Sequence, residues 1–167
     1  SSAKKEFAEV RIVSKNGDII AQNKISLNAK DWKQQTCTLI ATADDTDARL
    51  EIMPLQTGTY ALDMISLFPQ NTFKGRKNGL RRDLAQLIAD LQPRFIRFPG
   101  GCLAHGDGLD NMYDWKGSVG PLHERRHLPN IWHYHQTRGL GYFEYFQFCE
   151  DVGAEPLPII AAGVSCQ

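Results

Sequence analysis

Near Phe68-Pro69 the apolar residues of this chain change their spacing, and the change limits the folds that the chain can adopt. Before this point they alternate with polar residues, at the period of two that is typical of a half-buried strand. After it they recur at intervals of three and four, which is the period of an amphipathic helix. The sequence therefore predicts two parts of different construction, which we assign to residues 1–67 and 68–167.

The first part is predicted to be an antiparallel, β-sandwich-like segment. Asn16-Gly17 lies between the first two strand candidates, and this pair accepts the positive φ angles of a tight hairpin turn. Short turns join the candidates, and no helical pattern lies between them. The five predicted strands are Glu9–Val13, Asp18–Ile20, Thr36–Ile40, Arg49–Met53 and Tyr60–Leu67.

The second part alternates helix and strand patterns. An apolar stripe predicts the first helix, with Asn78 as its N-cap and Pro93 beyond its end. The residues of the stripe are Leu80, Leu84, Leu87, Ile88 and Leu91. A second helix is predicted over Tyr142–Val152, where Gly153 is a natural stop. One face of this helix is predicted to carry Tyr142, Tyr145, Phe146, Cys149 and Val152.

Strands are predicted at Arg94–Phe98 and Leu157–Ala162, with a long loop over residues 102–140 between the first strand and the second helix. The resulting order of helix, strand, loop, helix and strand is typical of a parallel sheet or a barrel. Two strands and two helices cannot close a (β/α)8 barrel. The second part is therefore predicted to be α/β, an incomplete (β/α)8 TIM-barrel segment of a longer protein.

Charge and composition argue against several classes of function. The chain carries 19 Lys and Arg against 19 Asp and Glu, so it lacks the positive surplus of a nucleic-acid-binding protein. No apolar run approaches the roughly 20 residues that span a bilayer, so no membrane partner is expected. None of the cysteines forms a C-x-x-C pair, so we expect no metal site and interpret the thiols as free and mostly buried. They are Cys37, Cys102, Cys149 and Cys166.

The candidate site lies where the two predicted strands of the second part end, because βα folds bind ligands at the carboxyl ends of their strands. These ends are Phe98–Cys102 and residues 162–167. Gly100-Gly101 can turn sharply and let a ligand approach the main chain, although a plain tight turn would have the same sequence.

Aromatic residues and all five histidines of the chain lie in the long loop, which favours a ligand cleft over disorder. Aromatic faces suit the apolar C–H surfaces of sugar rings; the alternative is that these rings hold the loop on its own domain. His133 and His135 are weak candidates for metal ligands, and surface histidines are the commoner case. The aromatic residues are Tyr113, Trp115, Trp132 and Tyr134.

Spacing alone nominates no pair of catalytic carboxylates. Glycoside hydrolysis usually needs two of them, facing each other across the scissile bond. Glu144 is predicted to be a surface charge on its helix. The other acidic residues of the loop, Asp107, Asp110, Asp114 and Glu124, do not follow a strand.

Several motifs in order resemble the family 51 glycoside hydrolases, the α-L-arabinofuranosidases. The resemblance covers roughly Ala61 to Gln167, and the first part resembles the carbohydrate-binding-like β domain that many such enzymes carry. The motifs are residues 62–69, residues 72–81, Arg97–Cys102, Trp115-Lys116, Val119–Pro121, Glu124-Arg125 and Cys149–Pro156.

The resemblance implies a retaining mechanism on a (β/α)8 barrel, with two Glu carboxyl groups about 5–5.5 Å apart. In the family the acid/base follows an Asn at the end of strand four, and the nucleophile ends strand seven. This chain contains no Asn-Glu dipeptide, so both catalytic Glu residues are expected beyond residue 167.

The resemblance also implies that Gly100, Gly101 and Cys102 form part of the arabinose pocket and that Trp115 lines the cleft from the loop. Many relatives carry an acidic residue and a glycine where this chain has Ala104-His105-Gly106. This part of the pocket is therefore expected to differ from that of those relatives.

We therefore expect a fragment of a retaining α-L-arabinofuranosidase that removes terminal non-reducing α-L-arabinofuranosyl groups from arabinose-containing polysaccharides or oligosaccharides. It is expected to need no cofactor and to be inactive without the rest of the enzyme. The alternatives are a non-catalytic carbohydrate-binding module and, with less support, a βα-barrel enzyme that acts on another substrate. The resemblance is compatible with secretion or a periplasmic location, and with a homo-oligomeric parent enzyme.

Overall fold

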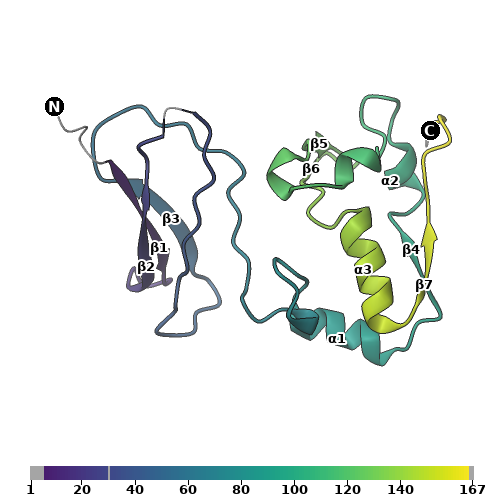
Figure 1. Ribbon diagram of the computed structural model, residues 1–167, viewed down its shortest axis with the longest axis horizontal. Coiled ribbons are helices and arrows are strands. Elements are labelled where there is room, and N and C mark those ends of the chain that lie inside the picture. The colour runs from purple at the N-terminus through teal and green to yellow at the C-terminus, as the bar shows by residue number, and fades with distance from the viewer. Residues whose placement is uncertain (1–5, 30, 166–167) are drawn as a thin grey trace. The chain divides into compact units, whose positions relative to one another are not determined.

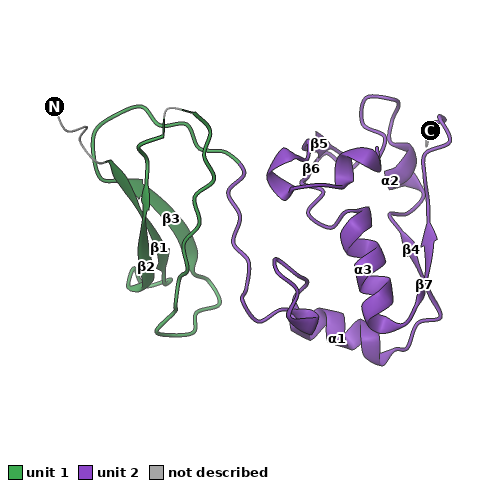
Figure 2. Cartoon of the chain, in the orientation of Figure 1, with its two compact units in different colours: residues 1–63 green, residues 64–167 purple. Residues whose placement is uncertain are grey.

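The computed structural model describes residues 6–29 and 31–165 (Figure 1). The chain divides into two compact units, Ser1–Asp63 and Met64–Gln167 (Figure 2). Cys166, one of the thiols interpreted as free, lies outside the described residues.

A three-stranded antiparallel sheet forms the first unit, in the order β2-β1-β3. Its strands are β1 (Phe7–Val13), β2 (Ile19–Ser26) and β3 (Arg49–Pro54). Ala8, Val10 and Val13 of the central strand are buried, so the alternation in the sequence marks the core face. The predicted hairpin at Asn16-Gly17 is confirmed: Gly17 has φ 94°, and the Asp18 amide donates to Ser14 Oγ over 3.0 Å.

Two of the five predicted strands are wrong. The segment Thr36–Ile40 has one hydrogen bond to β2, from Asn23 Nδ2 to the Thr38 carbonyl (2.8 Å). A second bond to β2 comes from just beyond the segment, from the Thr42 amide to the Ile20 carbonyl (2.9 Å). Ile40 is 79% exposed, and Cys37 and Leu39 are only half-buried, so this β-rich run has no fully buried face. The described residues of this unit form one sheet rather than the two layers of a sandwich.

The second wrong strand is Tyr60–Leu67, which belongs to no sheet in the described structure. Met64 interrupts it with a φ of 52°, a backbone conformation that no regular strand contains. Its apolar side chains are exposed as a result, at Leu62, Ile65 and Leu67.

The second unit has the predicted order of helix, strand, loop, helix and strand (Figure 1). Helix α1 (Arg82–Asp90) precedes β4 (Phe95–Phe98), and α3 (Tyr142–Val152) precedes β7 (Glu155–Pro158). Strands β4 and β7 pair in parallel, and α3 packs against both of them. The start of β7 lies two residues before the predicted start of the second strand, at Leu157, and its end lies four residues before the predicted end, at Ala162. The reason is that only Glu155–Pro158 pair with β4.

The long loop contains short elements of its own. They are helix α2 (Cys102–His105), single 3-10 turns at Lys116–Ser118 and Leu122–Glu124, and the antiparallel pair β5 (Leu128–Pro129) and β6 (His135–Gln136). A further 3-10 turn at Phe73–Gly75 precedes α1. The loop is therefore an ordered part of the unit, as its aromatic content predicts.

The two larger helices match their predictions to different degrees. Helix α3 has the predicted bounds, and Gly153 ends it in the left-handed conformation with φ 71°. Helix α1 begins at Arg82, and Asn78 is not its N-cap, because Asn78 lies in the preceding turn with φ 52°. The predicted stripe of α1 is mostly exposed, and Ala85 is the buried residue of this helix.

Two apolar clusters form the core of the second unit. The first contains Tyr113, Tyr142, Tyr145 and Cys149, and the second contains Phe73, Ala85 and Phe148. Phe148 is buried on α3, whereas Phe146, on the predicted face, is 43% exposed. Within the described residues, no helix has the length and apolar character needed to cross a membrane.

Candidate functional site

The turn that follows β4 contains three of the predicted site residues. The Phe98-Pro99 peptide bond is cis, and Gly100 has φ 126°, which favours glycine at this position. Gly101 precedes α2, and Cys102 is the exposed first residue of that helix. The Ile159 amide donates to the Phe98 carbonyl over 2.7 Å, so the segment after β7 continues beside this turn. Gly100, Gly101 and Cys102 therefore lie at the carboxyl edge of the parallel pair.

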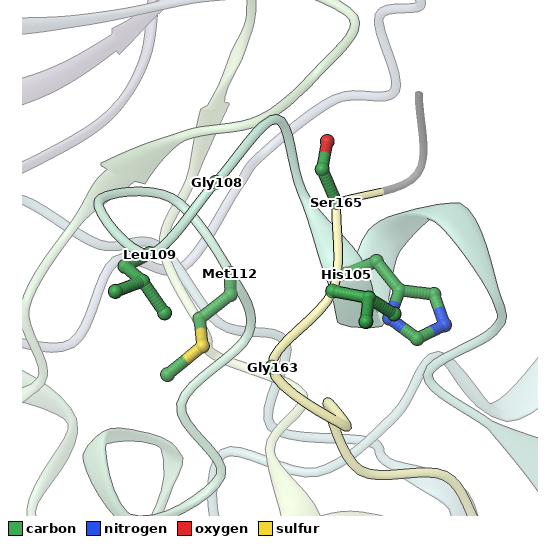
Figure 3. Close-up of a pocket in the computed structure, with 7 residues that line it drawn as sticks. His105, Gly108, Leu109, Met112, Gly163 and Ser165 are labelled. Atoms are coloured by element: carbon green, nitrogen blue, oxygen red, sulfur yellow. The ribbon is translucent and has the colours of Figure 1, made fainter.

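A small cavity lies at this same edge (Figure 3). Its volume is about 60 Å³, and it is lined from the β4 side by residues 105–112 and from the β7 side by residues 163–165. Its lining residues are His105, Gly108, Leu109, Met112, Gly163, Val164 and Ser165, none of which is a carboxylate. Residues 166–167 of the predicted strand end lie outside the described residues.

His105 is one of the residues that line this cavity. Its Nδ1 atom is buried and has no hydrogen-bond partner among the residues that the structure describes. Buried polar atoms are normally paired, so this nitrogen is an exception in the described structure. Spacing alone does not identify His105 as a site residue.

An aromatic cluster supports the edge from within the unit. The Phe98 ring stacks on Tyr145 with centroids 4.9 Å apart, and it meets Tyr142 and Tyr113 edge-on at 5.6 and 6.0 Å. Tyr145 Oη donates to the Ile96 carbonyl over 2.6 Å, and burial raises the pKa of Tyr145 to about 12. Tyr113 is therefore part of the core, where it holds the loop on its own domain.

The Trp115 ring packs against the first turn of α3. The ring is 43% exposed and contacts the Tyr142 ring at 6.2 Å between centroids. No hydrogen bond or ring contact of the described structure joins Trp115 to Gly100, Gly101 or Cys102. The four predicted residues are linked instead through Phe98 and Tyr142, whose rings pack together.

A buried ion pair fixes the loop on α3. Arg125 donates from Nη1 and Nη2 to the two carboxylate oxygens of Glu144, over 2.9 and 2.8 Å. The prediction of Glu144 as a surface charge is wrong, because this pairing and a bond from the Gly141 amide (2.9 Å) hold it against the loop. Its position three residues after Gly141 is the sequence signal that could have identified it.

Two further aromatic residues of the loop remain exposed. Trp132 and Tyr134 are 52% and 58% exposed, and their rings stack at 6.3 Å between β5 and β6. Asn130 shapes this turn, since its Oδ1 accepts from the Trp132 amide over 2.9 Å. In the described part of the chain, no three His, Cys, Asp or Glu side chains gather in a way that could hold a metal ion.

Together these features define an α/β unit whose candidate ligand site lies at the carboxyl edge of parallel strands, under an ordered aromatic loop. A model of the α-L-arabinofuranosidase 1 domain matches residues 87–167, which contain all of these features. An extracellular exo-α-L-arabinofuranosidase from Streptomyces chartreusis is 43% identical over 145 residues, covering 80% of this chain and 17% of the relative. The α-L-arabinofuranosidase 1 of Arabidopsis thaliana is 42% identical over 161 residues, covering 93% of this chain and 24% of the relative.

The structure comparison agrees with the sequence comparison. An arabinose-bound family 51 α-L-arabinofuranosidase superposes with a TM-score of 0.77 at 30% identity, covering 99% of this chain and 27% of that enzyme. The chain is thus related to the family 51 α-L-arabinofuranosidases, which confirms the resemblance of its motifs. It spans about a quarter or less of the length of these relatives.

Proposed function

We propose that this chain is part of a retaining α-L-arabinofuranosidase that releases terminal non-reducing α-L-arabinofuranosyl groups from arabinose-containing polysaccharides or oligosaccharides. One observation carries the proposal. The region that matches the arabinofuranosidase domain is the region that builds the carboxyl edge of β4 and β7 and the loop beside it. Ligands of parallel βα folds bind at such an edge.

The proposal gives the second unit the role of an incomplete (β/α)8 barrel. β4 and β7 would be neighbouring barrel strands, with α3 as the helix that connects them. The carboxyl edge would then form one wall of the arabinose pocket, with Gly100, Gly101 and Cys102 in the wall and Trp115 beside the cleft. Residues 1–67, which include the first unit, would be the carbohydrate-binding-like segment.

The catalytic carboxylates would come from outside these 167 residues. Retaining hydrolysis needs an acid/base and a nucleophile about 5–5.5 Å apart. None of the residues that line the cavity at the described edge is an acid, and Glu144 is occupied by Arg125. The chain alone is therefore expected to be inactive.

The test is hydrolysis of 4-nitrophenyl α-L-arabinofuranoside by the full-length protein that contains this chain and by the 167-residue chain. We expect turnover by the full-length protein only, with an α-configured first product seen by NMR, and a raised KM for Cys102→Ser. The matching β-D-xylopyranoside is the control substrate. An inactive full-length protein or an inverted product would contradict the proposal, and turnover by the 167-residue chain would place the carboxylates within it.

Two further proposals concern the whole enzyme. We propose that it is exported, because the S. chartreusis relative is named an extracellular enzyme.

A homo-oligomeric state stays a prediction, which light scattering of the full-length protein would test. Retention of arabinan by residues 1–66 alone would instead favour the alternative of a carbohydrate-binding module.

A further inference from the structure

The pair Arg125–Glu144 is the most enclosed charged contact of the second unit. The Arg125 side chain is 2% exposed and that of Glu144 is 23% exposed. All three guanidinium nitrogens of Arg125 donate hydrogen bonds. A planar guanidinium is suited to such bidentate contacts, and a lysine ammonium cannot reproduce them.

Arg125 joins three separate pieces of main chain. Nε and Nη2 donate to the Gly120 carbonyl over 3.1 and 2.8 Å, and Nη1 donates to the Arg138 carbonyl over 2.7 Å. Glu144 supplies the third connection, since its carboxylate also accepts from the Gly141 amide at the start of α3. One side chain therefore fixes both ends of the segment 120–138 on the first turn of α3.

This junction is continuous with the proposed sugar site. The Tyr142 amide donates to Ser118 Oγ over 3.1 Å, and Ser118 Oγ donates to the Trp115 carbonyl over 2.7 Å. Ser118 is completely buried, so a shift of the first turn of α3 would also shift Ser118. Tyr142 in turn contacts Phe98, whose carboxyl side leads into the turn at Gly100.

We propose that Arg125 and Glu144 are positioning residues, which hold Trp115 and the loop in place on the first turn of α3. The inference rests on the proposed arabinofuranosidase activity, and it assigns the pair to substrate binding rather than to the chemical step. The carboxylates that cleave the bond would lie elsewhere, so loss of the pair would loosen one wall of the pocket and leave the reacting groups intact. Such a loss raises KM and leaves kcat nearly unchanged.

The chain offers a matched control on the same helix. Arg76 donates from Nε and Nη2 to Asp151 over 3.2 and 2.7 Å, so it forms the same kind of bidentate pair at the last turn of α3. Arg125→Lys and Arg76→Lys each replace a bidentate contact by a single ammonium. Glu144→Gln keeps the shape of the Glu144 side chain and removes its charge.

The first experiment measures kcat and KM of the full-length protein and these variants with 4-nitrophenyl α-L-arabinofuranoside. We expect Arg125→Lys to raise KM about tenfold with kcat within about twofold, since misplacing a positioning group can cost up to about a hundredfold. Glu144→Gln should raise KM less, and Arg76→Lys should leave it unchanged. A fall in kcat with an unchanged KM, or equal effects of the two Arg variants, would mean that the pair only supports the fold.

Hydrogen exchange of the same proteins tests the ordering directly and does not depend on activity. Arg125→Lys and Glu144→Gln should speed exchange of the amides of Ser118, Gly141 and Tyr142, whereas Arg76→Lys should not. Equal exchange in all variants would overturn the inference. A wild-type protein with no arabinofuranosidase activity would instead refute the proposed function, and the exchange contrast would still decide whether the pair orders the loop.

Discussion

Replacing Gly141, the N-cap of α3, by alanine should lower the stability of the second unit far more than an alanine at a helix N-cap usually does. A Cβ atom at residue 141 would lie 2.0 Å from the Ser118 carbonyl oxygen and 3.0 Å from Arg125 Nη1. Real Cβ contacts essentially never fall below 3.0 Å, so the two backbones would have to separate by about 1 Å. Such a shift would weaken the bond from the Tyr142 amide to Ser118 Oγ.

The expected loss adds two contributions. Overpacking a close contact costs about 1–3 kcal/mol, and alanine is a poorer N-cap than glycine by roughly 1 kcal/mol, so the free energy of unfolding should fall by about 2–4 kcal/mol. Urea unfolding of the 167-residue chain, followed by tryptophan fluorescence, measures this loss. At a slope of about 1–3 kcal/mol per M, the midpoint should move by about 1 M or more.

Gly139→Ala is the matched control for this measurement. The nearest atom to a Cβ at residue 139 is Thr137 Oγ1, at an ordinary 3.4 Å. Its free energy of unfolding should stay within about 0.5 kcal/mol of the wild-type value. If Gly141→Ala proves as harmless as Gly139→Ala, the close approach of the loop to α3 is refuted.

Two further variants test the core. Because burial raises the pKa of Tyr145 to about 12, the stabilisation from its protonated form is complete below pH 10 and is lost as the pH rises from about 10 toward 12. Urea midpoints between pH 8 and 11 should therefore fall less for Tyr145→Phe than for the wild type, and parallel curves would contradict the burial of this phenol. Phe73→Ala should cost about 3–5 kcal/mol of unfolding free energy, because Phe73 is 4% exposed. Phe143→Ala, at a 58% exposed ring, should cost under about 1 kcal/mol in the same assay, and equal losses would place Phe73 outside the core.

Local signals in the sequence predict the elements that depend on neighbouring residues. Helix α3 has its predicted bounds, because the signals that define it are local. The aromatic residues of one face lie within the helix, and Gly153 follows its last residue. The hairpin at Asn16-Gly17 is likewise confirmed, since the turn joins strands that are adjacent in the chain. Strand β4 is also predicted to within one residue, although its partner β7 lies about 60 residues further along the chain.

The errors arise where the outcome depends on distant partners. The segments Thr36–Ile40 and Tyr60–Leu67 have the composition of strands, but a strand also needs a neighbour to pair with. The pairing of Arg125 with Glu144 has no periodic signal, because the two residues are not neighbours on any single element. The roles of Gly100, Gly101, Cys102 and Trp115 stay a prediction, since neither their position at the edge nor their packing identifies what they bind.

The connections of the loop also bear on the order in which the second unit assembles. Arg125 and Glu144 are 19 positions apart, and Ser118 and Tyr142 are 24 apart, whereas the bond from Tyr145 to Ile96 spans 49. Closing a longer stretch of chain costs more entropy, so the nearer contacts are favoured early in folding. On the ribosome the loop and α3 also emerge before β7, so they can form a local nucleus first. The parallel strands, which look like the framework of the unit, would then be the last part of it to come together.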